Sequence, residues 1–304
     1  MFFGIITGFA TALINSAGYL FSSRFLLYYK SPVRLLIMAS MLMMLISLPF
    51  MIWLTPFALI PDLPVYLGET VLSGLLFLLG QGAFFGALRF FEASRLSSLL
   101  GLKIIVLSII FVIFGGVLNL WQCTAVVLAA LSALMFNWSG SQKSSLKGWA
   151  LLLITLVAYS CVDMLETDLV VKMQEYTGFS PLRSSLAVVP LMYAVLGAMC
   201  LPGLFFYKPD KGQLGKAFPY ALLWLLSQVL LLCCYTFLKP VFGNVILATR
   251  GIFSVLAGAA LPCFGLAALD SKIPASLWIR RGIAALVMLG AIALYSFASV
   301  LSVD

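Results

Sequence analysis

Two cationic residues lie deep inside apolar stretches, and they are the strongest indication of chemistry in this sequence. Lys103 follows Arg95 by eight residues in RLSSLLGLKIIVLSIIFVIFGG, which corresponds to about 12 Å along a helix. Arg250 ends a second apolar stretch, GNVILATR. A lysine or arginine at the centre of a bilayer costs about 2.5–3.5 kcal/mol on insertion scales, so it normally faces a water-filled cavity or a partner.

The two side chains differ in the way they bind an anion. An arginine guanidinium holds a carboxylate or phosphate through two parallel hydrogen bonds, whereas a lysine ammonium acts as a point charge. We therefore expect Lys103 and Arg250 to bind an anionic group of a substrate. The alternative is a structural ion pair, with Glu92 or Asp163 as the partner.

Two carboxylates are candidates for proton coupling or for an ion pair. Asp163 and Glu166 are three residues apart in YSCVDMLETDLVVKM and so lie near each other on one helix face. A carboxylate in a low-dielectric medium takes up a proton more readily, which suits a coupling proton. Asp168 and Lys172 follow at once, which favours the alternative that the helix emerges into water here and leaves both carboxylates solvated. Glu92 is a third candidate.

Several uncharged polar residues are candidates to line the same cavity. Gln81 and Gln228 occupy matching places in two apolar stretches, where amides either bind a polar substrate or hydrogen-bond across helices. The other candidates lie singly within apolar stretches, where a polar side chain more often links helices; they are Asn15, Tyr19, Ser160 and Tyr235.

The composition indicates a chain that is solvated by lipid. Of its 304 residues, 63% are hydrophobic and 9% are charged, and the mean hydropathy is +1.14. Soluble domains are about half apolar and about a quarter charged. We therefore expect an all-α integral membrane protein. The net charge of +8 then reflects loops held at an anionic membrane surface and not a nucleic-acid partner.

No pattern of residues indicates catalysis. The chain has no histidine, and its six cysteines lie in apolar stretches, where they resemble small buried hydrophobes more than disulfides or metal ligands. The sequence also lacks the GxxxxGK[ST] pattern that cradles phosphates. We therefore expect no enzyme activity, no cofactor and no bound metal.

Ten apolar stretches are long enough to span a bilayer, since a spanning helix needs about 20 mostly apolar residues. The polar stretch NWSGSQKSSLKG separates five of them from the other five, which predicts a first unit over 1–138, a linker over 139–148 and a second unit over 149–304. The predicted spans are 2–22, 33–54, 67–90, 96–117, 120–138, 149–171, 182–206, 219–238, 244–268 and 277–300.

The two halves show an internal repeat. LLFLLGQ at 75–81 matches LLWLLSQ at 222–228, an offset of 222 − 75 = 147. The same offset carries Lys103 onto Arg250. An odd number of helices in each repeat inverts the second copy, and inverted repeats bind substrate near the bilayer midplane. The sequence therefore predicts two inverted five-helix repeats with a site between them.

The segments GALRFFEASRLSSLL (86–100) and CYTFLKPVFGNVILATR (234–250) resemble the drug/metabolite transporter superfamily, EamA-like branch. The resemblance covers essentially the whole chain and implies ten helices in two five-helix repeats. It also implies similarity to the phosphate-ester and nucleotide-sugar transporters, which use basic residues on the fourth and ninth helices, where Lys103 and Arg250 lie.

The orientation of the chain has two conflicting indications. The first, third, fifth, seventh and ninth connections hold most of the lysines and arginines, whereas the others hold only Lys172, Arg183 and Lys239. Cytoplasmic loops are rich in these residues, which predicts that both termini face outward. The family resemblance implies that both face inward.

The sequence thus favours a secondary active transporter, an exporter or exchanger, in a bacterial inner (plasma) membrane. We expect it to move a small polar metabolite with an anionic group by alternating access, with a coupling proton or counter-substrate and with membrane lipids as its other partners, as a monomer or dimer. The alternatives are a lipid or polyprenyl-phosphate flippase, an amino-acid or metabolite exporter without anion selectivity, and a non-transporting scaffold.

Overall fold

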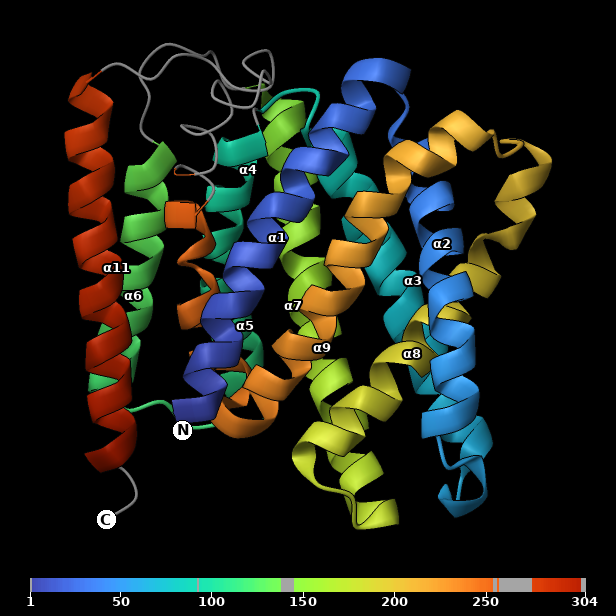
Figure 1. Ribbon diagram of the computed structural model, residues 1–304. Helices are drawn as coiled ribbons and strands as arrows, with labels where there is room; N and C mark the ends of the chain where they lie inside the picture. Colours follow the sequence, from blue (N-terminus) through green and yellow to red (C-terminus); the bar gives the residue numbers. More distant parts are fainter. Residues whose placement is uncertain (1, 92, 138–144, 254–255, 257–274, 302–304) are drawn as a thin grey trace.

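The protein is a bundle of helices (Figure 1). The computed structural model describes residues 2–91, 93–137, 145–253, 256 and 275–301, and this part of the chain contains no strand. Seven helices in it are long and apolar enough to cross a membrane, and two shorter apolar ones cover Leu120–Met135 and Gly282–Ala298. For the described residues, the expectation of an all-α protein is confirmed, as is that of several helices long and apolar enough to span a membrane.

The first half of the chain forms helices close to the predicted spans. A short 3₁₀ turn, η1 (Phe57–Leu59), precedes the third helix, and another, η2, leads from α4 into α5. The helices are α1 (Phe2–Tyr29), α2 (Pro32–Leu54), α3 (Leu63–Ala87), α4 (Ala93–Leu99), η2 (Leu100–Leu102), α5 (Lys103–Ile113) and α6 (Leu120–Asn137).

The second half begins with a helix that starts within the predicted linker. Gly178, at a φ of 66°, ends α7 in the left-handed conformation that glycine tolerates. The predicted span 244–268 is described only as far as residue 253 and at residue 256. The elements are α7 (Leu146–Thr177), α8 (Pro181–Cys200), η3 (Leu201–Phe205), α9 (Lys211–Leu247) and α11 (Ala275–Leu301).

Helix α9 is interrupted at Lys239. This residue has φ 63° and ψ 157°, and it precedes Pro240. A residue before proline is driven out of the helical region, and proline itself donates no backbone hydrogen bond. The chain therefore turns back at this point, and the segment from Pro240 onward runs in the opposite direction to residues 211–238 (Figure 1).

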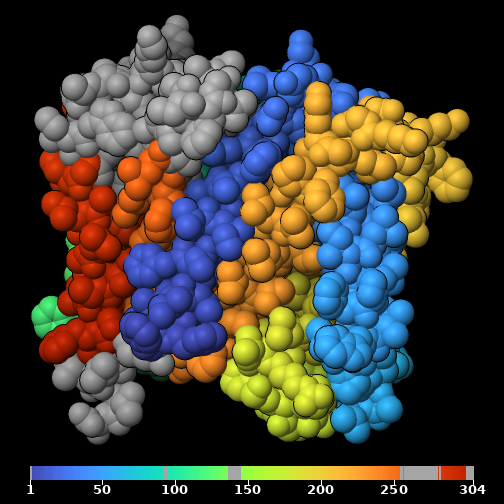
Figure 2. All heavy atoms as spheres, in the orientation of Figure 1, coloured from blue at the N-terminus to red at the C-terminus, as the bar shows by residue number. Residues whose placement is uncertain are grey.

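The helices pack in pairs that join the two halves of the chain. Helix α1 packs along α9, α3 along α7, α2 along α8, and α6 along α11. Figure 2 shows one face of the molecule, on which α1 and α9 lie side by side across the bundle. Helix α1 begins and α11 ends at the same end of the bundle (Figure 1).

The distribution of side chains is that of a protein in lipid. Large apolar residues such as Trp53, Phe114 and Leu286 are exposed on the outer surface. Small hydroxyl residues are fully buried between helices, as Ser40 and Thr155 are. Hydrocarbon solvates the outer apolar surface, and small polar residues allow helices to approach closely.

The contact between α2 and α8 gives a test of this packing. A Cβ at Gly197 would lie 2.7 Å from the backbone oxygen of Ser40 and 2.2 Å from Cβ of Met44. Gly197→Ala should therefore lower the free energy of unfolding by about 1–3 kcal/mol, because the two helices must move apart. Gly68→Ala is the matched control, since a Cβ at this position would have no neighbouring atom within 4 Å. Equal melting temperatures for the two purified variants would contradict this packing.

Candidate functional site

A cavity lies where helices of both halves meet; the space between its wall atoms is about 330 Å³ when the part open to the surroundings is counted. Its charged lining residues are Lys103, Asp163 and Arg250, which leaves one positive charge in excess. The walls are mainly aromatic and amide side chains. The other lining residues are Asn15, Tyr19, Phe77, Tyr159, Val162, Trp224, Gln228, Leu231 and Leu247.

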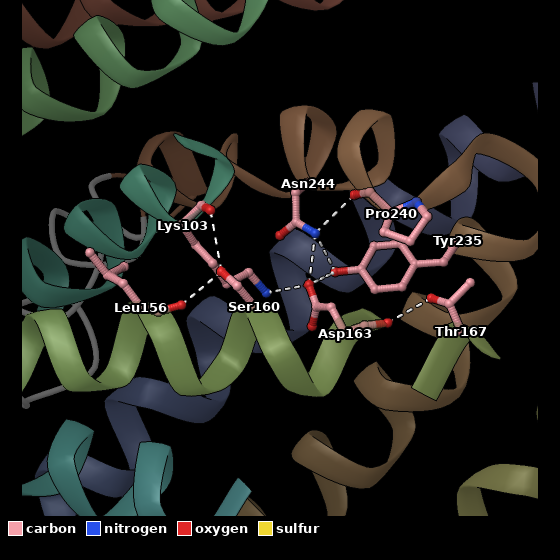
Figure 3. A network of polar contacts seen from close by, with 8 residues as sticks. All are labelled: Lys103, Leu156, Ser160, Asp163, Thr167, Tyr235, Pro240 and Asn244. Atoms are coloured by element: carbon pink, nitrogen blue, oxygen red, sulfur yellow. Dashed lines mark hydrogen bonds and ion pairs between the residues drawn. The ribbon is translucent and has the colours of Figure 1, made fainter. Parts of the chain in front are cut away.

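One oxygen of Asp163 accepts three hydrogen bonds from buried donors (Figure 3). The Nζ of Lys103 lies 2.7 Å from Oδ2 of Asp163, and their side chains are 4% and 6% exposed. The Tyr235 hydroxyl donates to the same oxygen at 2.5 Å, and Nδ2 of Asn244 does so at 2.7 Å. An ionised carboxylate only accepts hydrogen bonds, so this environment matches a charged Asp163.

The break in α9 brings the last two donors together. Tyr235 lies before Lys239 and Asn244 lies after it, yet Nδ2 of Asn244 donates to the Tyr235 hydroxyl at 2.7 Å. The same amide donates to the carbonyl of Pro240 at 2.9 Å. Across the network, the Ser160 hydroxyl donates to the carbonyl of Lys103 at 3.4 Å. The turn at Lys239 therefore brings two of the three donors to the carboxylate of Asp163.

Arg250 has a different environment. Its residue is 3% exposed and lines the cavity, and its guanidinium lies within hydrogen-bonding range of the Tyr19 hydroxyl. Its backbone carbonyl accepts a hydrogen bond from the Ser16 hydroxyl at 3.1 Å. Within the described ranges Arg250 forms no ion pair, and its Nε has no hydrogen-bond partner. Arg250 is thus a buried cation whose counter-charge is not supplied by the described protein.

The structure separates the two alternatives for the buried cations. Lys103 forms the ion pair with Asp163 that the sequence left open as an alternative, and it also lines the cavity. Arg250 lines the cavity without such a pair among the described residues. Glu92, the other suggested partner, lies outside the described residues.

The solvated alternative for the two carboxylates is wrong. Asp163 is 4% exposed and Glu166 is 3% exposed, because α7 stays inside the bundle beyond both of them. The exposed polar end of the helix begins at Asp168, and there Lys172 pairs with Glu69 at 2.6 Å and with Asp168 at 2.8 Å. Glu166 lines a second, smaller cavity.

The matched glutamines occupy different surroundings. Gln228 lines the large cavity. Gln81 does not; its Nε2 donates to the Tyr220 hydroxyl at 2.6 Å, and its Oε1 accepts from the Tyr159 hydroxyl. Gln81 therefore links α3, α7 and α9, which is the interhelical role that the sequence left as an alternative.

The single polar candidates also divide into two groups. Asn15 and Tyr19 line the cavity, and Oδ1 of Asn15 accepts a hydrogen bond from Ser227 at 2.6 Å. Ser160 and Tyr235 do not line it; they hold the network around Lys103 and Asp163. The first pair is available to a bound molecule, and the second pair positions charged groups.

Sequence reasoning did not single out Asn244 or the aromatic walls. Phe77 and Trp224 both line the cavity, and they are related by the same offset of 147 residues as Lys103 and Arg250. Asn244 stands as an isolated amide in the quoted stretch GNVILATR. The internal repeat could therefore have indicated Phe77 and Trp224 as lining residues. The role of Asn244 depends on the turn at Lys239, which the repeat does not indicate.

Comparison with known proteins gives the fold and no family. No protein-family model and no curated protein matches this chain. Among 28 matching chains of solved structures, one described as "Crystal structure of protein" covers 97% of this chain and 96% of its own. Its TM-score is 0.66 and the sequence identity is 11%. The likeness shows a shared overall fold.

The network around Asp163 predicts a large stability effect. Asp163→Ala leaves a buried ammonium without its counter-charge and should lower the free energy of unfolding by about 3–5 kcal/mol. The double variant Lys103→Met with Asp163→Leu should recover much of this loss, because no buried charge remains. Thermal unfolding of the purified variants measures both effects.

Glu69→Ala is the matched control for the loss of an acid. The Glu69 side chain is 27% exposed and pairs with Lys172, so its removal should lower the free energy of unfolding by only about 0–1 kcal/mol. If Asp163→Ala is no more destabilising than Glu69→Ala, the buried pair does not have the structural role assigned to it.

Proposed function

We propose that this protein is a secondary active transporter for a small polar metabolite that carries an anionic group. The observation that carries the proposal is Arg250, a buried guanidinium on a cavity wall with no carboxylate partner among the described residues. Asp163 is already engaged by Lys103, Tyr235 and Asn244. We propose that a substrate anion supplies the compensating charge.

The electrostatic gain from such an anion is substantial. An anion about 4 Å from the guanidinium gains about 4 kcal/mol at an effective dielectric constant near 20. Arginine also offers two parallel hydrogen bonds to a carboxylate or phosphate. Tyr19, Asn15 and Gln228 add neutral polar groups around the same space. Phosphate esters, nucleotide-like compounds and carboxylated metabolites all fit this description.

We further propose ten spans in two inverted five-helix repeats, with α9 counted as two spans at the Lys239 break. In this arrangement α1 corresponds to α7 and α3 to the first segment of α9, so the contact of α1 with α9 corresponds to the contact of α7 with α3. Helix α2 corresponds to α8 and α6 to α11, and the members of each of these pairs pack on each other. The motif SPVR at 31–34 begins α2, and SPLR at 180–183 begins α8, each with its serine as the N-cap. These correspondences support a pseudo-twofold arrangement.

The repeat places the buried cations in related surroundings. Ser160 on α7 donates to the carbonyl of Lys103, and Ser16 on α1 donates to the carbonyl of Arg250. Each serine hydroxyl also donates to the carbonyl four residues earlier on its own helix, so the backbone of each cationic residue shares the hydroxyl of a serine from the opposite half. We propose that the halves rock about this centre to open the cavity to each side in turn, as inverted-repeat transporters do.

The resemblance to the EamA-like branch of the drug/metabolite transporters agrees with this mechanism. We propose that the protein resides in a bacterial inner membrane and that a proton or counter-substrate drives transport, with Asp163 and Glu166 as the acids available to a proton. Membership of that family, the absence of enzymatic activity and the direction of transport are parts of the same proposal.

Arg250→Gln tests the site directly. Thermal shifts of the wild type against inorganic phosphate, glycerol phosphate, nucleoside monophosphates and short carboxylates first identify a bound anion, because a ligand of the folded state raises its stability. Uptake of that anion into proteoliposomes should then fall about tenfold or more in Arg250→Gln, since a hydrogen bond to a charged group contributes about 1.5–3 kcal/mol.

Arg183→Gln is the control for loss of an arginine. Arg183 is exposed and stacks on Phe179, with 3.7 Å from Cζ to the ring centroid, so its replacement should leave uptake unchanged. Full uptake by a folded Arg250→Gln variant would refute the anion site. Movement of labelled lipid across the same vesicles, without uptake of any soluble anion, would instead identify a flippase.

A further inference from the structure

A second cavity lies between α3, α7 and α8, next to the large cavity; the space between its wall atoms is about 180 Å³ when the part open to the surroundings is counted. Phe77 lines both cavities, and the two are otherwise lined by different residues. The second cavity is lined by Gly74, Phe77, Glu166, Met192, Tyr193 and Leu196. Glu166 is the one charged residue in this lining, so the cavity has the opposite charge to its neighbour.

Glu166 is a buried acid that forms no hydrogen bond or ion pair in the described part of the chain, although the Lys103 ammonium acts on it at longer range. The residue is 3% exposed, and its carboxylate forms no ion pair or hydrogen bond with any described residue. Asp163, three residues earlier, has three donors on one oxygen. A buried carboxylate is not maintained in an apolar wall without a compensating group, so Glu166 requires a proton or a cation.

The remaining walls are suited to an organic cation. The rings of Phe77 and Tyr193 have centroids 5.7 Å apart and lie nearly perpendicular, with an interplanar angle of 81°. Aromatic faces attract an ammonium group, and a carboxylate beside them adds a full counter-charge. An anion in this cavity would be repelled by Glu166. Among charged ligands, the chemistry therefore selects a protonated amine.

The two cavities adjoin at Phe77, which lines both of them. Asp163 lines the large cavity and Glu166 the small one, and they are separated by about 4.5 Å along α7. The ring of Trp224 lines the large cavity, and its Nε1 donates to the hydroxyl of Tyr193 in the small one at 2.8 Å. The aromatic partition is thus formed by Phe77, Tyr193 and Trp224.

We propose that the cavity at Glu166 binds a protonated amino group of the same substrate whose anionic group binds at Arg250. The substrate is then zwitterionic. This inference rests on the proposed anion site and adds the second charge to the description of the substrate. Glu166 contacts the ammonium, and Phe77 and Tyr193 enclose it.

A homologous series of probes tests the inference. The ligands are ω-amino acids from glycine to 6-aminohexanoate, each paired with the unsubstituted carboxylate of the same chain length, and binding to the purified full-length protein is measured by thermal shift and calorimetry. At least one amino acid should bind about tenfold or more tightly than its paired carboxylate. Glu166→Gln should reduce this ratio to about one and leave the affinity for the carboxylate unchanged.

The variants separate failure of this inference from failure of the anion site. Arg250→Gln should weaken binding of both members of a pair, which tests the anion site alone. Asp168→Asn removes an acid from α7 that lies 2.8 Å from Lys172 and outside both cavities, and it should change neither affinity. The amine subsite is overturned if no amino acid binds more tightly than its paired carboxylate, or if Glu166→Gln preserves the preference.

Discussion

The ion pair between Lys103 and Asp163 is the interaction on which the rest of the centre depends. It joins α5 to α7, and the same carboxylate oxygen also accepts hydrogen bonds from the two segments of α9 through Tyr235 and Asn244. All three donors meet Oδ2, and Lys103 already balances the charge of this carboxylate, so Arg250 is left without a counter-charge among the described residues. The charge imbalance of the large cavity follows from this single assignment.

The surrounding hydrogen bonds hold the residues of this positively charged centre inside the bundle. Ser16 and Ser160 fix the backbone of the two cationic segments, and Gln81 links three helices through Tyr159 and Tyr220. These hydrogen bonds satisfy polar groups that lipid cannot solvate. Among the buried side-chain atoms of the described residues that lack a hydrogen-bond partner, Nε of Arg250 is the one that belongs to the wall of either cavity.

Much of the helical fold could be predicted from the sequence, because a bilayer requires long apolar helices whatever their packing. The depth of Lys103 and Arg250 was likewise predictable from their apolar flanks. The pairing of Lys103 with Asp163 could only be left open, because the choice of partner depends on how α5 packs on α7. Burial of Glu166 was missed because the nearby Asp168 and Lys172 suggest water, whereas they pair with each other at the more exposed end of α7. The role of Asn244 depends on a chain reversal at Lys239 that apolar patterning does not encode.

Arg250 should receive its counter-charge from a bound anion. Anomalous diffraction from crystals of the protein soaked with selenate and, separately, with bromoacetate tests this. We expect an anomalous peak within about 4–6 Å of the Arg250 guanidinium, the range in which opposite charges interact strongly, and its loss in Arg250→Gln. Peaks found only at the protein surface, with the cavity unoccupied at saturating anion concentration, would contradict it.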